Sequence, residues 1–190
     1  IVLVQDTIFA LSSGAPPAAI GVLRISGPEA GSALLALAGR MPRPRTASLG
    51  LLSDPLDGAP LDRALLLWFP GPDTATGEDL AELHCHGGRA VIAAVELALG
   101  AMPGLRRAEP GEFTRRAFAN GRMDLNAVEG LSDLLAAETQ QQRRAALLMT
   151  EGHFSRQIEM WRQAILRLAA MAEAALDFSD EGDVEGEQPA

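Results

Sequence analysis

The sequence lacks lysine entirely, has a single cysteine and contains no apolar run of membrane-spanning length. Because a Gly-x-x-x-x-Gly-Lys-Ser/Thr phosphate loop requires a lysine, none of the 190 residues can supply this nucleotide-binding motif. One cysteine excludes an internal disulfide and is typical of a reducing compartment. A transmembrane helix needs about 20 apolar residues, so no membrane span is predicted. We therefore expect a cytoplasmic protein.

The first residue is Ile1, with neither an initiator methionine nor a signal peptide before it, so we expect a processed or trimmed chain. Apolar residues make up 47% of the sequence, which is typical of a globular protein. The net charge is −9, and six acidic residues follow Leu176 without a basic one. Such an acidic end argues against a nucleic-acid-binding surface in the second half of the chain.

Strand and helix signals are interspersed over residues 1–120. Apolar stretches bounded by Gly and Pro turns predict six strands, and helix signals follow Pro28, the Gly87-Gly88 turn and Pro110-Gly111. Pro28 is expected at the first position of its helix, with Gly39 at the end. The expected strands are 6–11, 18–26, 47–52, 61–69, 80–86 and 105–108, and the expected helices are 28–38, 89–99 and 110–119. The pattern predicts one α+β domain with a mixed sheet.

The pattern changes near Asn120, because no strand signal follows and no proline occurs between Asp124 and Pro189. Asp124 is expected to cap one helix, and Thr139-x-x-Gln142 has the capping-box form for a second. The second helix is predicted to continue to about residue 176, a length of ~55 Å at 1.5 Å per residue. Its apolar positions recur at spacings of three and four, which predicts a packing seam. They are Phe154, Ile158, Trp161, Ile165, Leu168, Ala172 and Ala175.

No partner for this seam is evident in residues 121–190. We therefore expect residues 1–120 to form a complete domain and residues 121–190 to form an incomplete all-α domain.

The richest functional chemistry lies in residues 76–88. Strand side chains alternate, so Glu82, His84 and His86 should share one face of a strand that ends at a glycine turn. Three interpretations remain open from the residues alone. The polar face is simply solvated; the three residues bind a metal; or they line a pocket for a polar organic ligand, with Glu82 accepting hydrogen bonds and the glycine amides facing an anion.

Arg24 interrupts the otherwise apolar strand at 18–26. A guanidinium in a buried strand is costly without a partner, so Arg24 is expected either to form an ion pair or to contact a ligand.

Eight short motifs, in one order, resemble the tRNA modification GTPase MnmE (TrmE) family, and they cover nearly the whole chain. The motifs are Asp6-Thr-Ile-x-Ala, Gly21-Val-Leu-Arg-Ile-Ser-Gly27, Phe69-Pro-Gly-Pro72, Thr76-Gly-Glu-Asp79, Glu82-x-x-x-His86-Gly-Gly88, Pro110-Gly-Glu-Phe-Thr-x-Arg-Ala-Phe118, Asn120-Gly-Arg-x-Asp-Leu125 and Glu173-Ala-Ala-Leu-Asp-Phe178.

The resemblance implies a folate-binding α+β domain, similar to the aminomethyltransferase fold, that also forms a homodimer. A helical domain interrupted by an inserted G domain follows in the family, and this chain ends where the G domain is expected. The resemblance therefore implies a GTPase as the full-length protein, with GTP, Mg²⁺ and K⁺ bound only through the missing G domain. The 190 residues alone are expected to have no GTPase activity.

The family resemblance also implies carboxymethylaminomethyl modification of the tRNA wobble uridine with the flavoprotein partner MnmG. In this scheme 5-formyl-tetrahydrofolate or 5,10-methylene-tetrahydrofolate donates the one-carbon unit. Carried over by position, the folate contacts are Arg24, Glu82 and Arg122, the last standing where the family usually has lysine. No catalytic residue and no metal site are expected. The alternatives are a stand-alone folate-binding or dimerisation module and a metal-dependent hydrolase using Glu82, His84 and His86.

Overall fold

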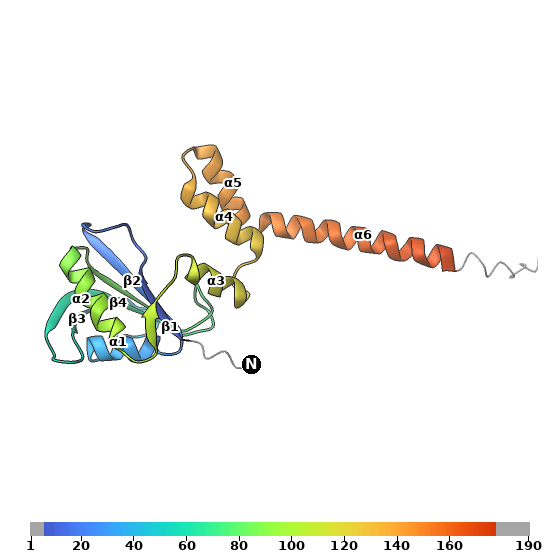
Figure 1. Cartoon of the computed structure of the whole chain (residues 1–190). Coiled ribbons are helices and arrows are strands. Elements are labelled where there is room, and N and C mark those ends of the chain that lie inside the picture. Colours follow the sequence, from blue (N-terminus) through green and yellow to red (C-terminus); the bar gives the residue numbers. More distant parts are fainter. Residues whose placement is uncertain (1–5, 178–190) are drawn as a thin grey trace, which may run out of the picture. The chain divides into compact units, whose positions relative to one another are not determined.

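The computed structural model describes residues 6–177, and Figure 1 shows its helices and strands. The described residues fall into two compact units that meet in the sequence at Met123 and Asp124. The first unit contains a mixed sheet with helices, and the second contains helices alone. The predicted α+β class is therefore confirmed. Within residues 6–177, no helix combines the length and apolar character that a membrane crossing requires.

The first unit is built on one six-stranded sheet with the order β3-β4-β5-β2-β1-β6. The β1–β6 pair is parallel and the other neighbours are antiparallel, so the sheet is mixed as predicted. The strands are β1 (Thr7–Leu11), β2 (Ile20–Ser26), β3 (Ser48–Ser53), β4 (Pro60–Phe69), β5 (Leu80–His86) and β6 (Leu105–Arg107). The helices of this unit are α1 (Ala30–Ala38), α2 (Arg89–Gly100) and α3 (Glu112–Ala119).

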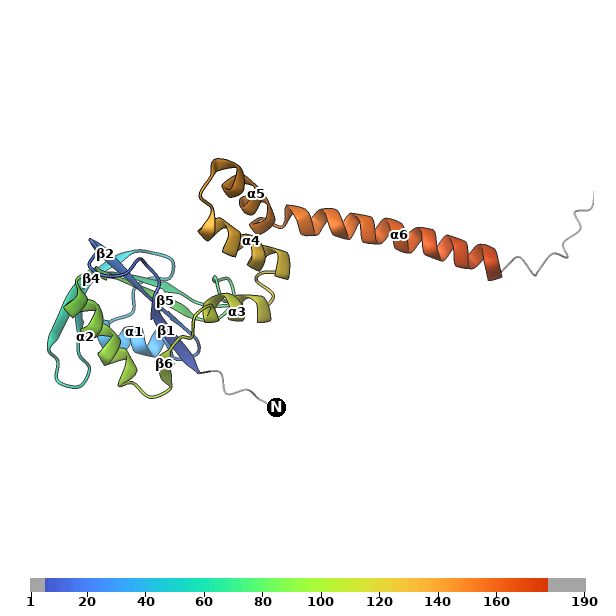
Figure 2. The ribbon, with the colours of Figure 1, turned by 45° about the horizontal axis from the view of Figure 1, so that its top comes forward.

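Helices α1 and α2 pack on one face of this sheet and enclose the core (Figure 2). Alternate residues of the central strands supply that face, including the fully buried Leu23 and Leu83, which pair in register. Two glycines allow close packing: a Cβ at Gly21 would lie 2.5 Å from the Ile92 side chain, and one at Gly50 would lie 2.6 Å from Leu66.

The opposite face of the sheet carries polar residues on β2 and β5 and exposed leucines on β3 and β4. Its leucines include Leu49, which is 58% exposed and pairs in register with Leu65, which is 37% exposed. Leu65 in turn lies opposite His84 on β5. We call this surface the open face of the sheet.

The second unit begins with α4 (Leu125–Ala136), followed by α5 (Gln140–Thr150) and α6 (His153–Asp177). Both predicted caps are confirmed. The Asp124 carboxylate accepts a hydrogen bond from the Ala127 backbone N–H at 2.8 Å, and Thr139 with Gln142 forms the capping box. Helices α4 and α5 approach closely at Gly130, where a Cβ would lie 2.8 Å from the Thr150 backbone nitrogen.

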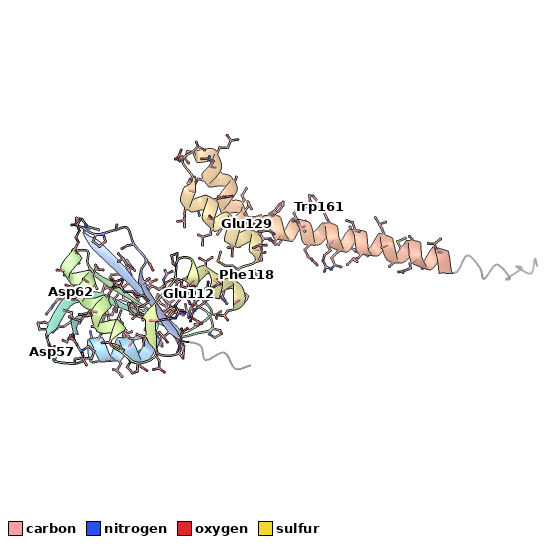
Figure 3. All side chains as sticks on the ribbon, viewed as in Figure 1. Asp57, Asp62, Glu112, Phe118, Glu129 and Trp161 are labelled. Carbon is pink, nitrogen blue, oxygen red and sulfur yellow. The ribbon has the colours of Figure 1, made fainter. Side chains whose placement is uncertain are left out.

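The prediction of one continuous helix from Thr139 to residue 176 is wrong. The chain turns at Gly152, whose φ of 72° lies in the left-handed region that ends an α-helix, and α6 starts at the next residue. The placement of Pro28 at a first helical position is also wrong, because α1 begins at Ala30 with Glu29 before it. The large apolar side chains of the predicted seam on α6, from Phe154 to Leu168, are exposed, and Figure 3 labels Trp161 among them.

Candidate ligand-binding site

Arg24 and Glu82 form an ion pair on the open face of the sheet. Strands β2 and β5 place the two residues directly opposite each other, although 58 positions separate them in the sequence. Arg24 donates from Nε at 3.0 Å and from Nη2 at 2.7 Å, both to Oε1 of Glu82. The side chains are 31% and 15% exposed. Of the two roles predicted for Arg24, the structure shows the ion pair.

The Glu82 carboxylate is ionised and still has room for a further donor. Burial raises its pKa, but hydrogen bonds from Arg24 and His84 outweigh this effect and leave the pKa below its usual value. His84 contacts Oε2 at 3.3 Å through Nε2. A carboxylate offers about four acceptor positions, and these contacts occupy three of them. The unfilled position belongs to Oε2.

An aromatic neighbour supports the Arg24 guanidinium and, through it, the Glu82 carboxylate. The Phe113 ring of α3 lies beneath the Arg24 guanidinium, with its centroid 5.8 Å from Cζ. A cation over an aromatic face is attracted by the ring's quadrupole. The carboxylate is therefore fixed by contacts from β2, β5 and, through Phe113, α3.

Glu82 also lines a small cavity of about 210 Å³. The other walls come from the end of β4, the following loop and the segment before β3. The lining residues are Arg45, Phe69, Asp73, Thr74, Ala75 and Leu80. The cavity thus combines two carboxylate residues, a guanidinium and an aromatic ring. It is smaller than the roughly 300–1,000 Å³ of pockets that enclose drug-sized ligands, so it can take only part of such a molecule.

Arg122, the third predicted contact, does not line this cavity. Its Nη1 donates to the Asp73 carboxylate at 3.2 Å, and Asp73 is a cavity wall. The stem of Arg122 packs on Gly77, where a Cβ would lie 3.2 Å from Cγ of Arg122. The structure therefore brings Arg24 and Glu82 together and links Arg122 to the cavity only through Asp73.

The three residues of the metal hypothesis do not gather into one site. His86 pairs through Nδ1 with the Asp62 carboxylate at 2.7 Å, and its backbone N–H donates to the same carboxylate. Across residues 6–177, no group of three His, Cys, Asp or Glu side chains is placed to hold a metal ion. The metal-dependent hydrolase therefore has no ligand set in the part of the chain that the structure describes.

The glycine turn after β5 packs against the segment before β2, and one of its two amides is not free for an anion. The Gly87 N–H donates to the Ala19 carbonyl at 3.3 Å, so this amide is occupied. A Cβ at Gly87 would lie 2.6 Å from the Ala18 carbonyl oxygen, so only glycine fits. Cys85 is buried, and burial with the nearby Asp62 raises its thiol pKa to about 12, which suits an unreactive core residue.

Comparison with known proteins identifies a family for each of the two units of the chain. The family model described as "GTP-binding protein TrmE N-terminus" matches residues 7–122, which is more than half of the chain. The chain belongs to the TrmE (MnmE) family. A second model, described as "MnmE helical domain", matches residues 125–189. The two matches meet where the two compact units meet.

Similar proteins carry the same family name. The tRNA modification GTPase MnmE of Novosphingobium aromaticivorans is 69% identical over 94% of this chain and 41% of its own length. The tRNA modification GTPase MnmE of Erythrobacter litoralis is 64% identical over 98% of this chain and 44% of its own length. The chain thus spans about two fifths of the length of the curated relatives that it matches.

Three of the MnmE-like motifs meet in an ion network that the sequence did not reveal. Arg116 of α3 donates to Asp6 at 2.8 Å, to Glu112 at 3.2 Å and to Glu78 at 3.2 Å. Arg106 of β6 donates to Glu112 at 2.6 Å and also binds Asp6. The only sequence signal was the spacing of Glu112 and Arg116, four residues apart on a helix.

The network is buried at its centre, and each of its charged groups has at least one oppositely charged partner. The Glu112 side chain, labelled in Figure 3, is 3% exposed, and the Arg106 hydrogen bonds hold its pKa at about 2. Glu78 accepts a further hydrogen bond from the Ser26 hydroxyl at 2.7 Å. Removing one member of such a buried pair leaves an uncompensated charge, which is strongly destabilising. The network therefore ties α3 to β1, β2, β6 and the turn before β5.

Proposed function

We propose that this chain is the N-terminal part of a tRNA-modifying GTPase and that it binds a tetrahydrofolate one-carbon donor. Membership of the TrmE (MnmE) family supports the first half of the proposal. The observation that carries the second half is Glu82: an ionised, largely buried carboxylate, fixed by Arg24, with an unfilled acceptor position in a cavity.

The residues of the cavity suit the chemistry of a reduced folate. The pterin ring presents a row of N–H donors along one edge, and a fixed carboxylate is the acceptor that complements them. In this proposal Glu82 accepts from that edge, while Arg24 keeps the carboxylate charged and oriented. The Phe69 ring and Leu80 form an apolar wall for a flat ring. Arg122 acts through Asp73, which it holds at the wall of the cavity. The bound folate, either 5-formyl-tetrahydrofolate or 5,10-methylene-tetrahydrofolate, supplies the one-carbon unit for modification of the wobble uridine.

The remaining parts of the proposed reaction belong to other segments or other molecules. In this proposal GTP, Mg²⁺ and K⁺ bind to a G domain beyond these 190 residues. MnmG is the flavoprotein partner, and tRNA is the substrate of the complex. The assembly works in the cytoplasm. We also propose a homodimer through the first unit. The exposed leucines of the open face support it, because a second copy would cover an apolar surface that monomers rarely leave bare.

Isothermal titration of the purified chain with 5-formyl-tetrahydrofolate tests the folate proposal. Glu82→Ala is expected to weaken binding by about 10- to 150-fold, since a hydrogen bond to a charged group contributes roughly 1.5–3 kcal/mol. Glu82→Gln should restore little, because half of the amide is a donor. Glu129→Ala, which removes an exposed carboxylate from α4, is the matched control and should bind like the parent.

Circular dichroism establishes that each variant is folded before its affinity is compared. The proposal would be refuted if folded Glu82→Ala bound 5-formyl-tetrahydrofolate as tightly as the parent. It would also be refuted if the parent itself did not bind this ligand.

A further inference from the structure

The cavity beside Glu82 has a second charged wall that the resemblance to the family did not point to. Arg45 lies in the segment between α1 and β3 and lines the same cavity as Glu82. Its guanidinium lies over the Phe69 ring, 5.9 Å from the centroid, and its Nη2 donates to the Asp73 carbonyl. These contacts hold the cation at the cavity without neutralising it.

The charge of Arg45 is not balanced within the chain. Among residues 6–177, the ion pairs include Arg24, Arg106, Arg107, Arg115, Arg116, Arg122 and Arg162, but not Arg45. A carbonyl oxygen accepts its hydrogen bond but carries no net charge. The cation is therefore free to meet an anionic group of a ligand.

The backbone at Arg45 is held in a conformation that a side chain disfavours. Its φ is 57°, and within residues 6–177 it is the only non-glycine residue with positive φ. The left-handed region costs roughly 1–2 kcal/mol for a residue with a Cβ. The Arg45 N–H donates to the Trp68 carbonyl at 2.7 Å, which fixes this conformation against the end of β4. Glycine would serve the turn better, so the strained arginine points to a use for its side chain.

The position of Arg45 indicates which part of the ligand it meets. Glu82 is largely buried at one wall of the cavity, whereas Arg45 is exposed. A volume of about 210 Å³ is below the roughly 300–1,000 Å³ of pockets that enclose drug-sized ligands, so part of a bound folate must extend towards solvent. The remainder of a folate ends in glutamate carboxylates, for which a planar guanidinium is a matched donor.

We propose that Arg45 binds the glutamate tail of the folate and thereby orients the ligand whose pterin edge Glu82 receives. This inference rests on the proposed folate site and adds a specificity-determining residue to it. It assigns opposite chemistry to two walls of one cavity: a carboxylate for the donor-rich head and a guanidinium for the anionic tail.

The test compares two ligands on one set of variants by calorimetry. One ligand is 5-formyl-tetrahydrofolate, and the other is its bis-amide, in which both glutamate carboxylates are neutral. Arg45→Ala is expected to weaken binding of the acid by about two- to fivefold, less than Glu82→Ala because Arg45 is exposed to screening solvent. The same variant should leave the affinity for the bis-amide unchanged. Arg43→Ala is the matched control, since it removes an exposed arginine two residues away that does not line the cavity.

Arg45→Gly separates binding from backbone strain. Glycine adopts positive φ without strain, so this variant should unfold at the same or a higher temperature than the parent and still show the roughly two- to fivefold loss of affinity. Equal affinity of the parent and Arg45→Ala for the acid would overturn the role of Arg45 alone, as would equal losses for both ligands. Failure of the parent to bind the acid would instead overturn the folate site on which this inference rests.

Discussion

Neutralising Glu112 should destabilise the first unit strongly, and the loss should fade in acid. The side chain is 3% exposed and accepts hydrogen bonds from Arg106 and Arg116. These contacts, the Arg106 bonds foremost, lower its pKa from 4.5 to about 2. At about 1.4 kcal/mol per pKa unit, this difference corresponds to about 3 kcal/mol of stability at pH 7. Glu112→Gln keeps the volume and removes this contribution.

The dependence on pH follows from the direction of the shift. A carboxylate whose pKa is depressed in the folded state stabilises fully above its unfolded value of 4.5, and it loses this effect as pH falls towards the folded value of about 2. The difference in unfolding free energy between the parent and Glu112→Gln should therefore be about 3 kcal/mol at pH 7. It should be about 1 kcal/mol at pH 3.

Urea unfolding followed by tryptophan fluorescence measures this difference. The sequence has two tryptophans, Trp68 on β4 and Trp161 on α6. In a Trp161→Phe background the signal reports the first unit alone, and the exposed position of Trp161 makes the replacement mild. The control is Glu109→Gln, since Glu109 is 65% exposed and pairs only at the surface with Arg115. A loss for Glu112→Gln that is the same at pH 7 and pH 3 would refute the reasoning.

Two further predictions concern the dimer and the second unit. Leu49→Asp, on the open face, should shift a dimer towards monomer in sedimentation velocity. The control Leu56→Asp lies in the β3–β4 turn and should leave the dimer intact, although Leu56 is 80% exposed. Equal behaviour of the two variants would show that the open face is not the dimer interface. Gly130→Ala should lower the stability of the second unit by about 1–3 kcal/mol, because its Cβ would meet backbone atoms of α5 that cannot move aside. Faster amide exchange in α4 and α5 would reveal this loss, and exchange as slow as in the parent would contradict it.

Signals carried by a few contiguous residues predicted most of the fold. Asp124 caps its helix, Thr139 and Gln142 form the capping box, and Gly39 ends α1 with a φ of 66°. The continuous helix through Gly152 was wrong because helical spacing on both sides says nothing about the φ of the residue between. A glycine can continue a helix at a cost of about 1 kcal/mol or end it at no cost in strain.

The candidate site was less predictable because its contacts join distant segments. Alternation correctly placed Glu82 and His84 on one face, but only the register of β2 and β5 brings Arg24 to that carboxylate. Arg45 gave no signal in the sequence, since its position depends on a positive φ and on the loop that contains Asp73. The network around Glu112 was missed for the same reason.

Helix α3 connects the buried ion network around Glu112 with the Arg24–Glu82 ion pair at the cavity. This connection explains why the network matters for the candidate site. Phe113 follows Glu112 directly in the sequence, and its ring supports the guanidinium of Arg24. Arg24 in turn fixes the carboxylate of Glu82. A binding carboxylate works best when its neighbours hold it in one geometry before the ligand arrives. Because the network anchors α3 to the sheet, it also anchors the aromatic support of the ion pair at the cavity.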